Sequence, residues 1–162
     1  MSFLRLAIAL TSLLLLGGCA GYRLGPTNGT AAGERSIKVA PFANSTLEPH
    51  LSDAVTQQMR KQLQRDGTFR LASRDEADIV LNGVLTRYDR FEISFAPNDV
   101  LTGLDYRLIL VAQVTARERS SGKTILDKEV RGQTLIRVGN DLTSAERQAL
   151  PLLAEDLAKN IT

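Results

Sequence analysis

The residue best placed for chemistry is Cys19, the only cysteine of the chain. It follows one positive charge, Arg5, an apolar run from Leu6 to Leu16 that is too short to span a bilayer, and two small residues, Gly17 and Gly18. A thiol in this setting accepts a diacylglyceryl group in bacterial lipoproteins, where the leader is cut before the cysteine and the new amino terminus is acylated. The pattern predicts a lipoprotein signal peptide over residues 1–18 and lipidation of Cys19.

The residue after Cys19 bears on which membrane would hold the anchor. Residue 20 is Ala and not the Asp that retains lipoproteins in the inner membrane in enterobacteria-like sorting. This favours the periplasmic side of the outer membrane, and several acyl chains, at about 0.8 kcal/mol for each buried methylene, form a stable anchor. In the alternative interpretation, Cys19 is an ordinary cleavage-site residue or a free thiol.

The sequence contains few residues suited to a catalytic or metal site. Its one histidine, His50, stands at a predicted helix start, Asp75-Glu76 lies in a turn, and Asp78 begins a strand. No Gly-x-Ser-x-Gly motif, phosphate-binding loop or metal-ligand cluster is present in the sequence. We therefore expect a protein that is not an enzyme and that carries neither a cofactor nor a metal.

Composition limits the domain count and the partners. Removal of residues 1–18 leaves 144 of the 162 residues, with 19 basic and 18 acidic side chains. This suffices for one domain, and a nearly neutral chain without a basic run does not indicate a nucleic-acid binder. We expect a lipidated Cys19 with a flexible tether over residues 19–35 and a single domain over residues 36–162. Nothing in the sequence suggests a homo-oligomer.

The first half of the domain reads as strand, helix, strand. Residues 36–42 predict a strand and residues 44–48 a turn. Residues 49–66 predict a helix with Pro49 in its first turn, a stripe of Leu51, Val55, Met59 and Leu63, and a stop at Gly67. Residues 68–72 predict a short strand parallel to the first. A long strand begins near residue 78, with Gly83 marking either a bulge or the close approach of a helix. Its alternation places Ile79, Leu81, Gly83 and Leu85 on one side and Asn82, Thr86, Tyr88 and Arg90 mainly on the other.

The second half reads as a hairpin and a final helix. After a loop over residues 96–103, residues 104–119 alternate clearly, Ser120-Ser121-Gly122 turns the chain, and residues 123–138 return antiparallel. Thr143 and Glu146 have the spacing of a capping box for the last helix, which contains Pro151. Its apolar stripe is Leu150, Leu153, Leu157 and Ile161. The expected fold is α+β: a two-layer sandwich of a mixed, mostly antiparallel sheet of four or five strands with two helices on one face.

Four stretches of the chain follow one another in a characteristic order and spacing. They are Gly-Cys-Ala-Gly-Tyr-Arg-Leu at the anchor, residues 37–42 leading into the helix at 51–63, Ala-Asp-Ile-Val-Leu-Asn-Gly at 77–83, and the segment from Tyr-Arg-Leu at 106–108 to Gly132. Together they resemble the LptE family of lipopolysaccharide-assembly lipoproteins. The resemblance covers nearly the whole mature chain. It implies a domain lodged as a plug inside the outer-membrane β-barrel LptD, where the pair inserts lipopolysaccharide into the outer leaflet.

The resemblance also implies surfaces for each partner. A sheet face that mixes polar and aliphatic residues suits a barrel's polar interior, although many solvent-facing sheets have the same composition. The candidate barrel-facing residues are Gln113, Thr115, Arg131 and Gln133. Arginine forks near lipid A phosphates would bind lipopolysaccharide. One cluster, Arg90, Arg107 and Arg137, could converge near the 96–103 loop, and a competing patch comprises Arg117, Arg119 and Lys123.

Two alternatives stay open on the sequence alone. Either arginine cluster can be an ordinary solvated charged surface, since charged side chains usually are. The alternative function is a non-enzymatic lipoprotein adaptor of another outer-membrane barrel or envelope complex. The two functions differ in the partner, because a barrel requires its plug in order to fold or work and does not require an accessory adaptor.

Overall fold

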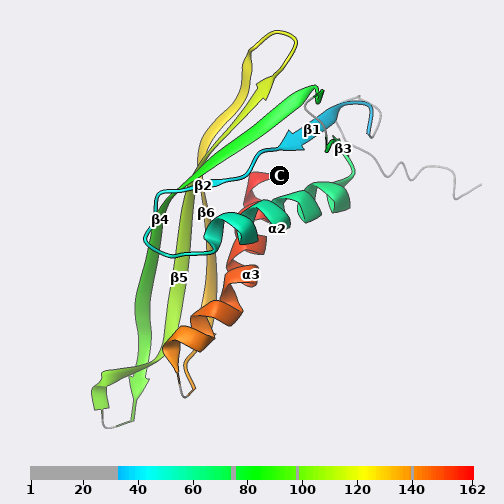
Figure 1. The fold of residues 1–162 in the computed structure, drawn as a ribbon. Coiled ribbons are helices and arrows are strands. Elements are labelled where there is room, and N and C mark those ends of the chain that lie inside the picture. Colours follow the sequence, from blue (N-terminus) through cyan, green and yellow to red (C-terminus); the bar gives the residue numbers. More distant parts are fainter. Residues whose placement is uncertain (1–32, 74–75, 98, 140) are drawn as a thin grey trace, which may run out of the picture.

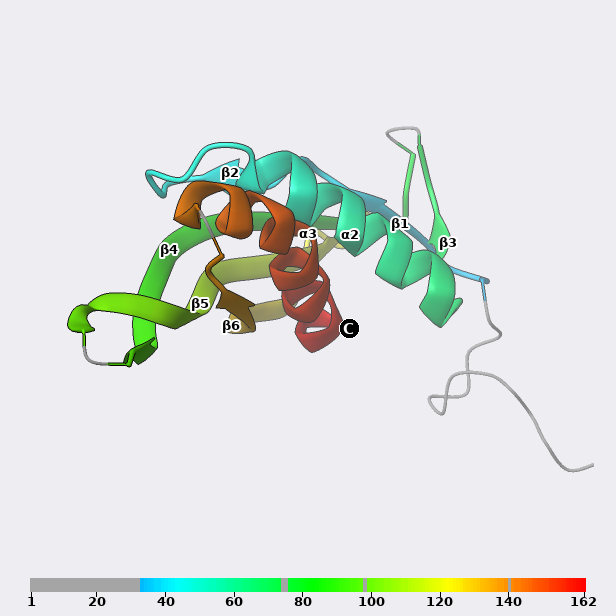
Figure 2. The same ribbon diagram turned by 90° about the horizontal axis from the view of Figure 1, so that it is seen from below.

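The chain forms a two-layer α+β fold in the computed structural model, which describes residues 33–73, 76–97, 99–139 and 141–162. Helices α2 (Leu51–Asp66) and α3 (Leu142–Ile161) cover one face of a mixed, open sheet (Figures 1 and 2). The predicted fold class and layer arrangement are confirmed. The strands are β1 (Ser36–Val39), β2 (Ala43–Asn44), β3 (Arg70–Leu71), β4 (Ile79–Ala96), β5 (Asp99–Glu118) and β6 (Thr124–Arg137).

The sheet combines a parallel edge with a long antiparallel meander. Its order is β3-β1-β4-β5-β6, and β2 pairs with β4 beyond the end of β1. β1 runs parallel to β3 and β4, whereas β4, β5 and β6 are antiparallel neighbours. The predicted parallel strand, helix, strand unit is therefore present. The sixth strand, β2, occupies a stretch for which the sequence predicted the start of a turn.

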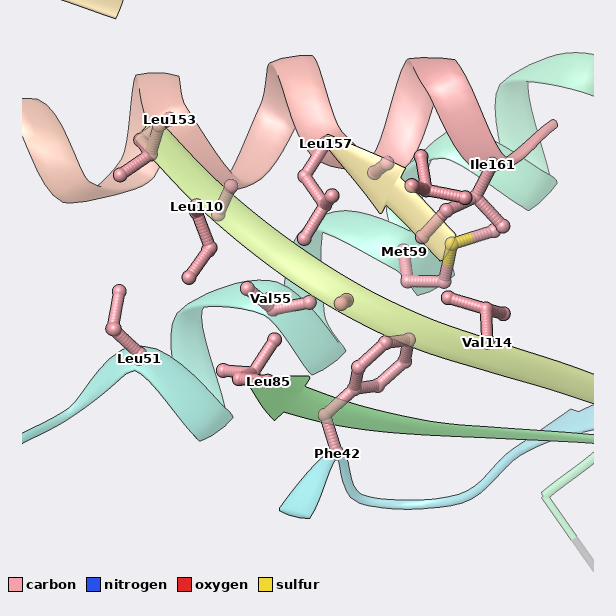
Figure 3. Packing of buried hydrophobic residues seen from close by; sticks show 14 of the residues in the cluster. Phe42, Leu51, Val55, Met59, Leu85, Leu110, Val114, Leu153, Leu157 and Ile161 are labelled. Carbon is pink, nitrogen blue, oxygen red and sulfur yellow. The ribbon is translucent and has the colours of Figure 1, made fainter. Parts of the chain in front are cut away.

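The core lies between the helices and one face of the sheet. The predicted stripe of α2 is buried, as are the alternate residues of β5 from Tyr106 to Ala116 and the apolar stripe of α3 (Figure 3). Burying a side chain such as Leu110 or Leu157 contributes about 1.5–3 kcal/mol to folding. The periods of 3.6 and 2 in the sequence thus correctly identified the core positions of these three elements.

The predicted loop over residues 96–103 is wrong in extent. β4 continues to Ala96 and β5 already begins at Asp99, so a long hairpin replaces most of that loop. Register shifts between Leu85 and Arg87 and again after Glu92 disturb the alternation of β4 without ending its pairing with β5. A β-bulge inserts one residue into a strand, and this explains why the alternation weakens there while the strand continues.

Two glycines allow close packing on the core side of the sheet. The ring of Phe42 covers Gly83, and a Cβ added at Gly83 would lie 2.0 Å from the Cε1 atom of that ring. Gly83 therefore marks neither a bulge nor a helix approach, because a side chain from the β1–β2 connection occupies the space. Gly132 is where a helix does come close: a Cβ there would lie 2.6 Å from the backbone nitrogen of Leu157 in α3.

The helix ends differ in part from the prediction. α2 begins at Leu51, so Pro49 precedes it, and Gly67 ends it in the left-handed conformation at φ 71° with its N–H bonded to Leu63 O. The cap of α3 is Asp141, whose carboxylate accepts the N–H of Thr143 at 3.2 Å and of Ser144 at 2.9 Å. The predicted capping box is wrong because Asp141 already binds these amides. Hydrogen bonds from Ser144 lower the pKa of Asp141.

Candidate functional site

The sheet face opposite the helices carries all four candidate barrel-facing residues. Arg131 and Gln133 of β6 are exposed beside Val111 and Ile109 of β5, respectively. Gln113 and Thr115 of β5 are half-buried, and the amide of Gln113 donates to Asp127 Oδ1 at 2.5 Å. The structure therefore brings these four side chains onto one surface, which we call the outer face.

The outer face also has an apolar component. Val111 projects there and is only 1% exposed, and its cross-strand neighbours are Arg87 of β4 and Arg131 of β6. The aliphatic stems of arginines cover apolar surface in this way while their charged groups stay in water. The outer face is thus a mixed surface of amide, hydroxyl, guanidinium and aliphatic groups.

Arg90 lies on the helix side of the sheet, opposite the outer face. The register shift between Leu85 and Arg87 moves Tyr88 and Arg90 onto the face of the buried residues of β5, since Tyr88 pairs with Leu110 and Arg90 with Leu108. The predicted orientation of these two side chains is therefore wrong. A one-residue shift in register transfers all following side chains to the other face.

Arg90 and Tyr88 share one carboxylate of α3. Arg90 Nη1 lies 2.5 Å from Glu146 Oε1, and the Tyr88 hydroxyl donates to the same oxygen over 3.4 Å. Glu146 raises the pKa of the Arg90 guanidinium through this hydrogen bond, and burial raises the pKa of the Tyr88 phenol. Arg90 thus ties β4 to the first turns of α3.

Arg107 and Arg137 lie together at the β4–β5 hairpin end of the outer face. Arg137 donates from Nε to Asp105 Oδ1 at 2.9 Å and from Nη2 to Oδ2 at 3.2 Å, and this pairing lowers the pKa of Asp105. Arg107 is exposed and makes no ion pair among the described residues. Of the three arginines of the first predicted cluster, Arg107 is therefore the one whose fork is open to an anion.

Two exposed apolar side chains flank Arg107, and the sequence-based site did not include them. Phe91 of β4 and Leu135 of β6 are its direct cross-strand neighbours and are 51% and 62% exposed. Leu135 stands at an outward position in the alternation of β6, and this signal could have identified it. A guanidinium between apolar side chains offers hydrogen bonds to a phosphate and apolar contacts to a hydrocarbon chain.

The competing patch lies at the opposite end of the sheet, around the β5–β6 hairpin (Figure 1). Arg117 Nη2 donates to the carbonyl oxygen of Gly122 at 3.3 Å, and the backbone N–H of Arg119 donates to Asp78 O, while Lys123 is exposed. Glu118 accepts hydrogen bonds from Arg35 and Ser121 in the same region. This patch is of mixed charge, whereas near Arg107 the carboxylates of Asp105 and Asp89 are already paired, with Arg137 and Arg87, respectively.

Comparison with known families decides where the chain belongs. Residues 34–162 match the model of the family described as "LptE: Lipopolysaccharide-assembly". The chain belongs to the LptE family. The match spans every helix and strand of the LptE domain described above, from β1 to α3. No protein with a curated function matches the sequence.

Solved structures share the LptE fold at low sequence identity. The protein CT253 of Chlamydia trachomatis has a TM-score of 0.57 and 11% identity, over 81% of this chain and 94% of its own. A minor lipoprotein of Acinetobacter baumannii has a TM-score of 0.51 and 16% identity, over 78% of this chain and 88% of its own. At such identities the likeness concerns the fold alone.

The remaining groups singled out in the sequence have structural partners or lie outside the description. Asp78 Oδ2 accepts both the N–H and the hydroxyl of Ser36 at 2.7 Å, and these bonds lower its pKa. His50 is exposed at the start of α2, and Cys19 and the tether up to residue 32 lie outside the described residues.

Within the described ranges no cluster of His, Cys, Asp or Glu is placed to hold a metal ion. Neither described helix has the length and apolarity to cross a membrane.

Proposed function

We propose that this LptE-family protein is a non-enzymatic outer-membrane lipoprotein that forms the plug of the LptD barrel and assists the insertion of lipopolysaccharide at the outer membrane. The family match over residues 34–162 carries the proposal, because it covers the entire folded domain. The partners are LptD, lipopolysaccharide and the membrane that holds the anchor. The domain lies on the periplasmic side, within the barrel lumen.

The outer face supports contact with a barrel wall. The inner walls of large outer-membrane barrels are polar, so a plug needs amide, hydroxyl and charged groups interspersed with aliphatic surface. Gln113, Thr115, Arg131 and Gln133 provide such groups on one continuous face, which the helices leave uncovered (Figure 2). We assign this face to LptD.

A tagged protein purified from its own outer membrane in mild detergent tests the plug role. A large β-barrel recovered at about one to one is the expected result. Recovery with other envelope proteins, or alone, would contradict it and would favour the adaptor function. Depletion gives a second criterion, because the barrel should fail to assemble without its plug and should assemble normally without an adaptor.

Gln113→Lys should reduce recovery of the barrel at least tenfold with little change in stability. The new ammonium group can still reach Asp127, which the Gln113 amide contacts now, so the fold loses little. Both charges of this ion pair must lose water in the interface with the barrel wall, and the cost of their desolvation opposes binding. Pull-down yield and urea unfolding measure the two effects. Equal destabilisation of the isolated domain would show instead that this face belongs to the core.

Cys19→Ala should yield a folded domain that is no longer attached to the membrane by itself. The thiol is the attachment atom for the diacylglyceryl group, and a chain without it has no acyl anchor. Membrane fractionation in cells lacking the barrel, with circular dichroism of the recovered protein, provides the measurement. A variant that still sediments with the membrane in those cells would contradict lipidation.

We place the lipopolysaccharide contact at Arg107. Arg107→Gln should weaken binding of purified lipopolysaccharide by about 10- to 100-fold, since a charge-assisted contact to a phosphate is worth about 1.5–3 kcal/mol. Arg117→Gln, in the competing patch, is the matched control and should leave the affinity unchanged. A larger loss for Arg117→Gln would move the contact to the β5–β6 hairpin, and equal small effects would mark both arginines as solvated surface.

A further inference from the structure

A cavity of about 320 Å³ opens where the C-terminal ends of α2 and α3 meet the sheet. Its walls are mainly apolar, and Figure 3 shows Met59 and Ile161 at this end of the core. Ile125 of β6 is 45% exposed and lines it, so the apolar wall is accessible from outside. We call this cavity the end groove; its principal walls are Met59, Leu63, Phe69, Ile125, Leu126 and Ile161.

The described chain starts at the rim of the end groove. The N–H of Gly33 donates to the carbonyl oxygen of Thr68 at 3.1 Å, and Thr68 and Phe69 line the groove. β1 follows at once beside β3 and the end of α2 (Figure 1). The first described residue of the chain, Gly33, therefore lies beside this apolar surface.

Those preceding residues include one segment with suitable chemistry, Gly21-Tyr22-Arg23-Leu24-Gly25. In an extended segment alternate side chains share a side, so Tyr22 and Leu24 would face the groove together. Arg23 would point out of the groove, from where its long side chain can bend back to the rim. Leu24 precedes Gly33 by nine residues, a reach of up to about 30 Å. Gly25-Pro26 and Asn28-Gly29 are turn-forming pairs that let the chain reverse toward the groove.

Charge complementarity favours the same occupant. α2 and α3 both end at the end groove, and the helix dipole gives each end a partial negative charge. Arg65 and Lys159 in the last turns, and Lys128, whose Nζ donates to Asn160 O at 3.2 Å, offset part of that charge. Asp66, the last residue of α2, adds a carboxylate to the rim. Arg23 supplies the cation that such a rim attracts.

We propose that Tyr22 and Leu24 dock in the end groove, with Arg23 at the Asp66 rim. If Cys19 carries the lipid, only Ala20 and Gly21 then separate the anchor from the docked segment. The tether thus becomes a short link that holds the end groove against the membrane. The docking itself does not depend on a role in lipopolysaccharide assembly.

Disulfide crosslinking in the full-length protein tests the docking. Leu24→Cys is combined with Ile125→Cys inside the groove or, as a matched control, with Gln64→Cys, an exposed position of α2 outside it. Isolated membranes are oxidised, and crosslinked protein is quantified. We expect at least a tenfold higher yield for the Ile125 pair. Tyr22→Ser should lower that yield at least fivefold without changing the control.

Three outcomes would overturn the docking: equal yields from the two pairs, no crosslink in the Ile125 pair, or a yield insensitive to Tyr22→Ser. A lipid could occupy the same apolar space. Recovery of an acyl lipid from the purified protein, lost in Ile125→Asp, together with an absent crosslink, would assign the end groove to that lipid instead of the tether.

Discussion

Gly132→Val should destabilise the domain by about 3 kcal/mol. A Cβ at this position would lie 2.6 Å from the backbone nitrogen of Leu157 and 2.8 Å from its Cα. Backbone atoms of a packed helix cannot rotate away as a side chain can, so α3 would have to move off β6. Urea unfolding of the Cys19→Ala form, followed by circular dichroism, measures the loss.

Gln133→Val is the matched control for this substitution. Gln133 follows Gly132 in β6, is exposed, and keeps its backbone hydrogen bond to Asp156 Oδ2 in α3 at 2.8 Å whatever its side chain. Valine favours strands in both variants, so the difference between them reports the contact with α3. Similar stabilities for the two variants would show that α3 does not pack this closely on β6.

Phe42→Ala should cost about 3–4 kcal/mol of the free energy of unfolding, because it empties a fully enclosed space. The ring, labelled in Figure 3, is 1% exposed. It lies over Gly83. Its backbone is held to α2 on both sides, since the N–H donates to Thr56 Oγ1 at 3.0 Å and the carbonyl accepts the Ser52 hydroxyl. The ring should therefore not shift easily to accommodate a change beneath it.

A double-mutant cycle separates this contact from other effects. Gly83→Val alone should also destabilise strongly, because its Cβ would overlap the ring. In the Phe42→Ala background the valine fills space that the ring has left, so the combined loss should fall short of the sum by at least about 1.5 kcal/mol. Additive losses would contradict direct packing of the ring on Gly83.

The two glycines have a shared consequence for the proposed function. Each permits an element from the helix layer or the β1–β2 connection to approach the sheet closely, on the face opposite Gln113 and Thr115. Core variants at Gly132 or Phe42 should thus reduce barrel recovery only through the amount of folded protein. Gln113→Lys should reduce it with the folded fraction intact, and this contrast distinguishes a packing defect from an interface defect.

The periodicity of apolar residues in the sequence predicted most of the fold. The alternation from Tyr106 to Ala116 and the four-residue spacing in α2 identify buried positions directly, because only one face of each element meets the core. The same reasoning separated the outer face of β5 and β6 from the core face. It failed in the distal half of β4, where register shifts interrupt the alternation of apolar and polar residues although the strand continues.

The sequence by itself determined the α+β class, the core stripes and the membership of Gln113, Thr115, Arg131 and Gln133 in one surface. Only the tertiary structure decided which arginines are available. One shift near Thr86 turns Arg90 toward Glu146, and cross-strand register sets Arg137 beside Asp105 and Arg107 between Phe91 and Leu135. Such pairings join residues far apart in the chain, and a difference of one residue in register reverses them, so no local pattern can specify them.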